Sequence, residues 1–369
     1  MKKIRIMLGG IAMLSLLTWL SGCLIKPTFP NFDPKSLTPD QVKTLASLEK
    51  VDDHPLYVMR FYGDYSFALK LKKKYYKQLG LPNPPKCTTF AALNPNGDPL
   101  FGRNQDELDH PALLLFTNPP NGYASVCLVN IGGTFGFDTR TNTPFSSEVD
   151  RTRLLFTPYF FSDGMNEWGL AIGDMSVFDA KVAFDPNKET MFDTETKRYL
   201  LDHAKNVDEA LAILPRFNIC FPPSGRTTHF LLADPSGNSA VVEWNNGKMV
   251  VIRNEHPWQV ASNFMISSSQ ELIKNYTAEY RKNNGKVTND KGRIFWRYIT
   301  AWDTLQKMNG LLTSAEAMNL LQTVSLTQSK ENWFPTQWSV VYNMKTGNID
   351  IAMGRNYSHV YKYKLEMKK

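Results

Sequence analysis

The sequence predicts an α+β fold, in which antiparallel sheets are covered by helices on their outer faces. The first observation is composition: 42% of the 369 residues are hydrophobic and 21% are charged, which is typical of a globular chain with a large core. The second is order, because strand-like and helical segments alternate in blocks along the chain. The third is that most consecutive strands can be joined by hairpins, which favours antiparallel pairing over a doubly wound parallel sheet.

The first residues have the layout of an export signal. A basic start precedes the apolar run IMLGGIAMLSLLTWL, and LSGC follows at residues 20–23. This ending resembles a bacterial lipobox, which predicts removal of residues 1–22 and attachment of lipid to the thiol of Cys23. An ordinary signal peptide with an incidental cysteine is the alternative. No later segment has about 18 consecutive apolar residues, so we expect a membrane-anchored lipoprotein on the extracytoplasmic side of the cell envelope.

Two segments are expected between this signal and the main domain. Residues 23–50 are rich in proline and lack apolar periodicity, which predicts a lipidated tether. Residues 51–86 carry an aromatic cluster, a helical pattern that ends at Gly80, and the extended connector LPNPPK. We expect this second segment to be a propeptide that stays bound as a small α chain, because its aromatic side chains need burial. The main domain is then 87–369.

The main domain is expected to alternate between strands and helices. A hairpin is predicted where two apolar segments flank NPNGD, and the next predicted strands are ALLLFTN, YASVCLVNI, RLLFTPYFF and WGLAIGDMSVF. Two helices are predicted in FDTETKRYLLDHAKNVDEALAILPRF, before the hairpin TTHFLLADPSGNSAVVEW and the strand KMVVIRN. Three helical stretches over roughly 266–325 and the closing hairpin QWSVVYNMKTGNIDIAMG follow.

Cys87 follows the connector directly and is a candidate for a new chain end. A cut between Lys86 and Cys87 would place a thiol and a free α-amine on adjacent carbons of one residue. An α-amine titrates near ~7.7–8.0, so it can accept a proton at neutral pH without a histidine. The thiolate is the nucleophile, and a nearby cation lowers its pKa. One residue would then supply both nucleophile and base, as in N-terminal threonine enzymes.

The predicted hairpin brings two charged residues toward Cys87. With a turn centred on Asn96-Gly97, Asp106 falls opposite Cys87, where it could orient the α-amine. Arg103 lies three residues earlier and would face the other side of the sheet, unless the strand bulges or ends near Gly102. A surface ion pair beside a buried cysteine is the alternative.

The residues from Cys87 onward resemble those of a known family. CTTF and GRNQDE are similar to the start of the mature chain in the Ntn-hydrolase group of choloylglycine hydrolases, penicillin V acylases, N-acylethanolamine acid amidase and isopenicillin-N acyltransferase-like (C45-type) proteins. The similar motifs GMNEWGLAI, THFLLADPSGNSAVVEW, ASNF, GRIFWR and TQWSVVYN follow in family order. HPLYVMRFYGDY, at 54–65, resembles the N-terminal part of bacterial C45-type members. The resemblance implies a four-layer αββα sandwich with two stacked antiparallel sheets.

The resemblance also implies roles for residues near Cys87. Cys87 is similar to the family nucleophile, which would be freed by self-cleavage after Lys86. Arg103 resembles the arginine beside the thiol, and Asp106 resembles the aspartate that holds the α-amine.

Three later residues bear on the same site. Asn263, in ASNF, resembles the asparagine whose side-chain amide contributes to the oxyanion hole. Arg293 resembles a distal arginine near the active site of choloylglycine hydrolases, with a helix-surface arginine as the alternative. Ser176 departs from the bile-salt hydrolases, which usually have an asparagine there. This departure puts the second oxyanion donor in doubt and argues against bile salts as substrate.

Other polar residues have less specific interpretations. His229 lies on a predicted strand and is expected to be a packed structural histidine, the alternative being the base of a Cys/His hydrolase. Cys127 and Cys220 could form a disulfide or remain buried free thiols. No histidine forms a metal-type cluster with cysteines or carboxylates, so we expect no metal and no cofactor.

The predicted activity is hydrolysis of a linear, non-peptide amide C–N bond in an N-acyl substrate, through an acyl-thioester on Cys87. An acyltransferase that uses the same thioester, and a non-catalytic lipoprotein that binds acylated ligands, are the alternatives. Penicillin V, bile salts, acyl-homoserine lactones and N-acyl amines or amino acids all remain open as substrates. The basic run KLKKKYYK is interpreted as a solvated helix face, so nucleic acid is not an expected partner, and a homo-oligomer is left open.

Overall fold

The computed structural model of the chain describes residues 31–69, 86–108, 111–132, 135, 147–178, 180–221, 227–285, 293–328 and 334–368. In these ranges the strands form a nine-stranded sheet, a six-stranded sheet and a two-stranded ribbon. The predicted signal peptide, Cys23 and the connector that precedes Lys86 lie outside the described residues.

The strands of the two main sheets follow each other in a defined spatial order. The larger sheet consists of β1 (Glu49–Asp52), β2 (Leu56–Phe61), β5 (Ala112–Thr117), β6 (Ser125–Asn130), β7 (Phe161–Asn166), β8 (Ala171–Val177), β11 (Thr227–Ala233), β12 (Ser239–Asn245) and β13 (Lys248–Arg253). The smaller sheet consists of β14 (Gln259–Ala261), β3 (Lys86–Leu93), β4 (Pro99–Asp106), β15 (Thr336–Asn343), β16 (Asn348–Met353) and β17 (Tyr361–Lys364). The ribbon pairs β10 (Phe217–Cys220) with β9 (Glu189–Phe192).

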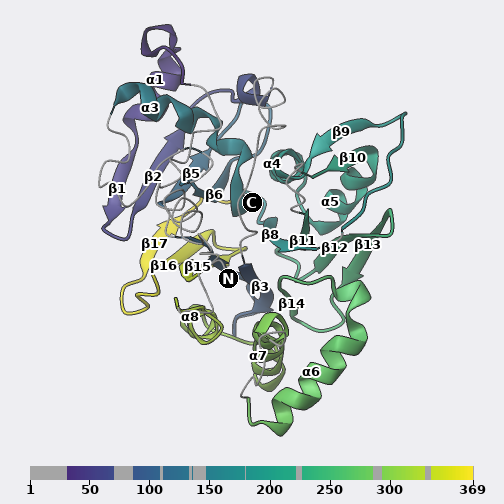
Figure 1. Cartoon of the computed structure of the whole chain (residues 1–369). Helices are drawn as coiled ribbons and strands as arrows, with labels where there is room; N and C mark the ends of the chain where they lie inside the picture. Colours follow the sequence, from purple (N-terminus) through teal and green to yellow (C-terminus); the bar gives the residue numbers. More distant parts are fainter. Residues whose placement is uncertain are drawn as a thin grey trace, which may run out of the picture.

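Helices cover the outer faces of both sheets (Figure 1). On the larger sheet they are α3 (Glu148–Arg151), the 3₁₀ helix η4 (Thr152–Tyr159), α4 (Asp193–His203), α5 (Val207–Ile213) and the short η5 (Leu214–Arg216). On the smaller sheet they are α7 (Arg293–Lys307) and α8 (Ser314–Thr323), with α6 (Gln270–Lys282) alongside α7, while η6 (Ile266–Ser268) contacts β12 of the larger sheet. β3 contacts β8 and β11, so the two sheets stack face to face and the predicted αββα sandwich is confirmed. In the described part of the chain, no helix is both long and apolar enough to cross a bilayer.

Side-chain alternation along the strands explains why this sandwich forms. In β5 every residue is buried, and consecutive side chains point to opposite faces. Leu114 and Phe116 pack in the apolar cluster that includes the smaller sheet. Leu113 and Leu115 pack in the second cluster, with Leu200 of α4. A strand buried on both faces needs a layer on each side, which is what the two sheets and two helix layers supply.

Two expectations about strands are corrected by the structure. β2 pairs with β5 in parallel, because the chain builds the β3–β4 hairpin of the other sheet before it returns. The segment RLLFTPYFF was predicted to be a strand, but residues Thr152–Tyr159 form η4. All eight residues of η4 are buried, so the segment has no solvent-exposed face that would give its sequence a regular helical pattern of apolar and polar residues.

The prediction that residues 23–50 form a tether without regular structure is wrong for residues 31–50, which the structure describes. η1 (Pro34–Ser36) and α1 (Pro39–Ala46) lie within it, and β1 begins before its end. A capping box starts α1: Thr38 accepts the N–H of Gln41, whose side chain accepts the N–H of Thr38, and Pro39 occupies the first helical position. This start signal was present in the sequence. The helix packs on β2 and η4, so this segment belongs to the fold.

Candidate active site at Cys87

Cys87 is the second residue of β3, and only 1% of its surface is exposed. In the hairpin of β3 and β4, Cys87 pairs with Gln105 and Lys86 pairs with Asp106. The prediction that Asp106 lies opposite Cys87 is therefore wrong by one residue.

The register differs because the turn contains three residues rather than two. The N–H of Asn94 donates to the carbonyl of Asp98 at 2.8 Å, and between them Gly97 adopts a φ of 80°, which glycine tolerates. Arg103 then falls two residue pairs away from Cys87 and on the same face of the sheet. The register runs without interruption from Lys86–Leu93 to Pro99–Asp106, so the predicted bulge is not required.

The guanidinium of Arg103 lies directly beside the sulfur. Its Nη2 is 3.2 Å from Sγ of Cys87. Two buried carboxylates balance its charge, because Nε lies 3.0 Å from Oδ2 of Asp163 and Nη2 lies 3.6 Å from Oδ1 of Asp174. Lys197 of α4 adds a second cation, with Nζ 3.1 Å from Oδ1 of Asp174. This network holds Arg103 in one position facing the thiol.

Asp106 lies on the opposite face of β4, where a second arginine reaches it. Nη1 of Arg297 is 3.0 Å from Oδ2 of Asp106, and the hydroxyl of Thr336 donates to Oδ1 at 2.6 Å. The same guanidinium donates to the carbonyl of Cys87 at 2.6 Å and to Oδ1 of Asn263 at 2.7 Å. Arg297 therefore joins Asp106, Asn263 and the main chain of Cys87.

Sequence reasoning selected Arg293 and missed Arg297. Arg293 is the first residue of α7, and its side chain is not among those described. Arg297 lies one turn later and is 1% exposed. It shares a helix stripe with the buried Ala301 and Leu305, at spacings of four residues. An arginine within an apolar stripe was the available signal, since a buried charge needs a partner.

Asn263 contacts the main chain of Cys87 from the segment that follows β14. The N–H of Cys87 donates to Oδ1 of Asn263 at 2.6 Å, and Nδ2 of Asn263 donates to the carbonyl of Ser176 at 2.9 Å. The hydroxyl of Ser262 donates to the carbonyl of Cys87 at 3.1 Å. Ser176 therefore enters the site through its main-chain carbonyl.

His229 is fully buried on β11 and ties this segment to the larger sheet. Its Nδ1 lies 3.1 Å from Oε1 of Glu243, and its Nε2 lies 2.7 Å from the carbonyl of Ser262. Glu243 also accepts two main-chain N–H groups of η6, at 2.6 and 2.9 Å. Both ring nitrogens make hydrogen-bond contacts within the fold, as expected of a structural histidine, and these contacts fix the loop that carries Asn263.

Burial raises the pKa of both the Cys87 thiol and the Asp106 carboxyl. It raises the pKa of the Cys87 thiol to about 12, against the opposing effect of the Arg103 guanidinium. It raises the pKa of Asp106 to about 6, although the charge of Arg297 and the hydroxyl of Thr336 lower it. In the uncut chain the thiol is therefore neutral at physiological pH.

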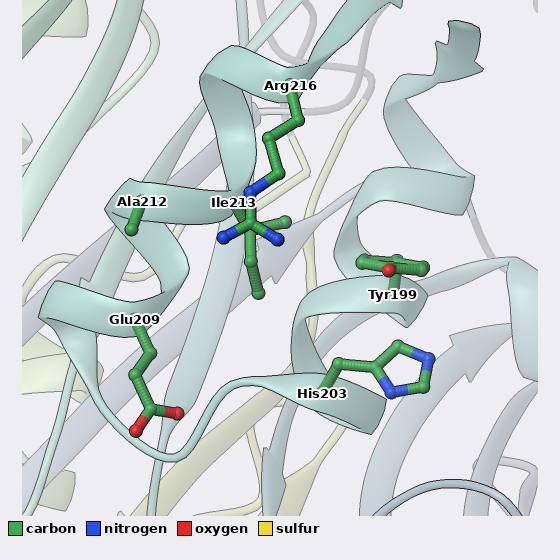
Figure 2. Close-up of a pocket in the computed structure, with 6 residues that line it drawn as sticks. All are labelled: Tyr199, His203, Glu209, Ala212, Ile213 and Arg216. Carbon is green, nitrogen blue, oxygen red and sulfur yellow. The ribbon is translucent and has the colours of Figure 1, made fainter.

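Other features contribute nothing to this site. Cys127 and Cys220 are both free thiols, so the disulfide alternative is wrong. Among the described residues, no group of His, Cys, Asp and Glu side chains is arranged to hold a metal. A surface pocket of about 300 Å³ lies between α4 and α5, and its lining contains no predicted site residue (Figure 2).

Comparison with solved structures identifies proteins with a similar fold. The chain is similar to a variant of conjugated bile acid hydrolase from Clostridium perfringens, with a TM-score of 0.54 and 17% identity over 77% of this chain and 93% of that one. It is also similar to penicillin V acylase from Agrobacterium tumefaciens, with a TM-score of 0.55 and 19% identity over 76% of this chain and 86% of that one. Both have Ntn-hydrolase folds, in agreement with the predicted sandwich.

Comparison of sequences gives the family. Over 207 residues the chain is 25% identical to penicillin V acylase from Pectobacterium atrosepticum, which covers 52% of each protein, so the chain spans about half the length of this curated relative. The model of the acyl-coenzyme A:6-aminopenicillanic acid acyl-transferase family matches residues 161–358, which is more than half of the chain. The chain therefore belongs to this family, within the C45-like group of Ntn hydrolases.

Proposed function

We propose that this protein hydrolyses a linear amide C–N bond of an N-acyl substrate, with Cys87 as an N-terminal nucleophile. One observation carries the proposal: each polar group of this buried cysteine is held by a different side chain. Arg103 contacts the thiol, Asn263 accepts the N–H, and Arg297 donates to the carbonyl. A cysteine that contributes only apolar packing does not require contacts with two buried arginines and an asparagine amide.

Self-cleavage after Lys86 would activate the protein. The Cys87 thiol attacks the carbonyl carbon of Lys86, the C–N bond to Cys87 breaks, and the acyl group passes from nitrogen to sulfur. The nitrogen takes up the thiol proton as it leaves. Water then hydrolyses the thioester, which yields a carboxylate on Lys86 and restores the thiol of Cys87. Asp106 pairs with Lys86 in the uncut chain, and Arg297 contacts both its carboxylate and the main chain of Cys87, so Asp106 would be available to the new α-ammonium.

Turnover of substrate would repeat the same chemistry. The α-amine of Cys87 takes the thiol proton, the thiolate attacks the amide carbonyl, and an acyl-thioester forms as the amine leaves with that proton. The Arg103 guanidinium favours the thiolate by its charge. Asn263 would donate to the oxyanion, for which its Nδ2 must turn from the carbonyl of Ser176. Arg297 would hold Asn263 and Asp106 in position.

The relatives support an acylated amide as the substrate class. Two of them are named for penicillin V and conjugated bile acids, both of which contain a linear amide. A second candidate function is acyl transfer, which the family's description favours. The two differ only in whether water or an amine resolves the thioester. Supplying competing amines and identifying the products would separate them.

The decisive experiment is intact-mass analysis with N-terminal sequencing of the purified protein. We expect a new N-terminus at Cys87 in the wild type, an intact chain for Cys87→Ala, and loss of amide hydrolysis in that variant on a panel of N-acyl amides. An intact wild-type chain would favour a non-catalytic binding protein. Unchanged processing of Cys87→Ala would point to an external protease. The same spectra would test the proposed lipid at Cys23, and with it the membrane anchor, by the added mass.

A further inference from the structure

Gln105 is the residue directly opposite Cys87 in the hairpin, and its side chain lies on the same face of the sheet as the thiol. Its side chain is 1% exposed, and its Oε1 lies 3.5 Å from Sγ of Cys87. Nη2 of Arg103 donates to the same oxygen at 2.7 Å. The thiol, the guanidinium and the amide oxygen therefore form a closed triangle of polar contacts.

The neighbouring carboxylate of Glu107 determines which end of the Gln105 amide faces the thiol. Nε2 of Gln105 lies 2.9 Å from Oε2 of Glu107, and Nδ2 of Asn130 lies 2.6 Å from the same oxygen. An ionised carboxylate only accepts hydrogen bonds, so the NH₂ end of Gln105 must face Glu107. The carbonyl end must then face Arg103 and the thiol. The sulfur therefore has a hydrogen-bond acceptor as a neighbour, to which only the protonated thiol can donate.

We propose that Gln105 orients the Cys87 thiol and holds it in the protonated form by accepting its hydrogen bond. A hydrogen bond to the neutral form of an acid disfavours the charged form. Gln105 also shares Nη2 of Arg103 with the sulfur, so it weakens the attraction between that guanidinium and a thiolate. Through both contacts it opposes thiolate formation until the α-amine or a substrate is in place. The inference rests on the proposed role of Cys87 as the nucleophile.

Several other charged groups lie close enough to Cys87 for their charge to act on the same thiol. They are Arg103 and Asp106 of β4, Asp174 of β8 and Arg297 of α7. Of these groups only Arg103 contacts Gln105, so a change in the titration of Cys87 in a Gln105 variant reports the lost hydrogen bond together with the released guanidinium.

The test uses two variants with opposite expected effects. Gln105→Met keeps the length of the side chain and removes the acceptor, so the thiolate becomes easier to form. Gln105→Glu places a negative oxygen in the same position, so the thiolate becomes harder to form. The matched control is Gln337→Met, since Gln337 is also 1% exposed and lies on the neighbouring strand, where its amide donates to the carbonyls of Glu107 and Pro335.

The measurement is the rate of Cys87 alkylation by iodoacetamide against pH, quantified by peptide mass spectrometry, with the partly exposed Cys220 as internal reference. We expect Gln105→Met to label about fivefold faster than wild type below the midpoint, which corresponds to one hydrogen bond of ordinary net strength. Gln105→Glu should label more slowly, and Gln337→Met should match wild type.

Equal midpoints in all four proteins, or shifts of the same sign in both Gln105 variants, would overturn the proposal, as would a thiol that labels in none of them. The assay needs neither self-cleavage nor an amide substrate. An uncut chain in the intact-mass analysis would therefore refute the proposed function separately, while the alkylation profiles still decide the role of Gln105.

Discussion

Replacing Arg297 by methionine tests the contacts on the Asp106 side of Cys87. The guanidinium and the carboxylate of Asp106 lie 3.0 Å apart, with side chains 1% and 0% exposed. Methionine has nearly the same reach but no charge, so the substitution takes from the buried Asp106 carboxyl its partner Arg297 and leaves it the hydroxyl of Thr336 as a donor. Breaking a buried pair in this way costs about 3–5 kcal/mol in the free energy of unfolding.

The assay is urea denaturation of the uncut protein, in the Cys87→Ala background so that processing does not change the sample. The control is Arg281→Met, which removes an ion pair with Asp303 at 3.2 Å whose arginine is 60% exposed. A surface pair of this kind contributes less than about 1 kcal/mol. The double variant Arg297→Met/Asp106→Asn should recover part of the loss, because no buried anion is left without a partner.

Self-cleavage gives a second readout in the protein with Cys87 intact. Arg297→Met should process slowly, since Asn263 and the carbonyl of Cys87 both lose a donor. The double variant should remain slow although it is more stable. The reasoning is refuted if Arg297→Met is within about 1 kcal/mol of the wild type, or if Asp106→Asn restores no stability to it.

Three further predictions concern the same hairpin and its neighbours. Asn263→Ala should lower the rate of amide hydrolysis by about 10²–10³, the usual effect of losing one oxyanion donor, and a fall in substrate affinity with unchanged kcat would contradict this role. Because burial raises the pKa of Asp106 to about 6, its carboxylate becomes protonated below that pH. The rate of self-cleavage should therefore fall as the pH is lowered, with a midpoint near 6. If Asp106→Asn shows the same fall in rate, the pH dependence belongs to another group. Gly102→Ala should destabilise the protein by about 1–3 kcal/mol in thermal or urea denaturation, because its Cβ would lie 2.3 Å from the ring of Phe90, and a neutral effect would show that this ring can move aside.

The ordered motifs predicted much of the architecture, because alternation and turn signals act locally. The helices α4 to α8 and the strands of the three predicted hairpins lie where the sequence placed them. The failures have specific causes. The 3₁₀ helix η4 is buried along its whole length, so it has no solvent-exposed face that its sequence could mark with a polar stripe. The parallel pairing of β2 with β5 depends on which sheet each strand joins, and that is decided by contacts distant in sequence.

The site was less predictable than the fold, because a shift of one residue in the pairing of β3 with β4 changes which side chains lie next to Cys87. Moving the pairing by one residue exchanged Asp106 for Gln105 as the neighbour of Cys87. It also placed Arg103 on the face of the thiol without a bulge. On α7, Arg293 and Arg297 are four residues apart, so both lie on the same side of the helix and the motif GRIFWR alone does not separate them. Arg297 is identified by its contacts with Asp106 and with the carbonyl of Cys87, which depend on how α7 packs against β3.

The uncut structure explains how Cys87 could become a chain end without losing its position. The bond to Lys86 is only one of the constraints on this residue. Its amide is held by Asn263, its carbonyl by Arg297 and Ser262, and its sulfur by Arg103 and Gln105. The strand continues from Thr88 to Leu93 in unbroken pairing with β4. On the other side of the cut, β2 is paired with both β1 and β5, so the segment that contains it stays in the larger sheet. Cleavage would therefore change the chemistry of one nitrogen and leave the sheets that position it in place.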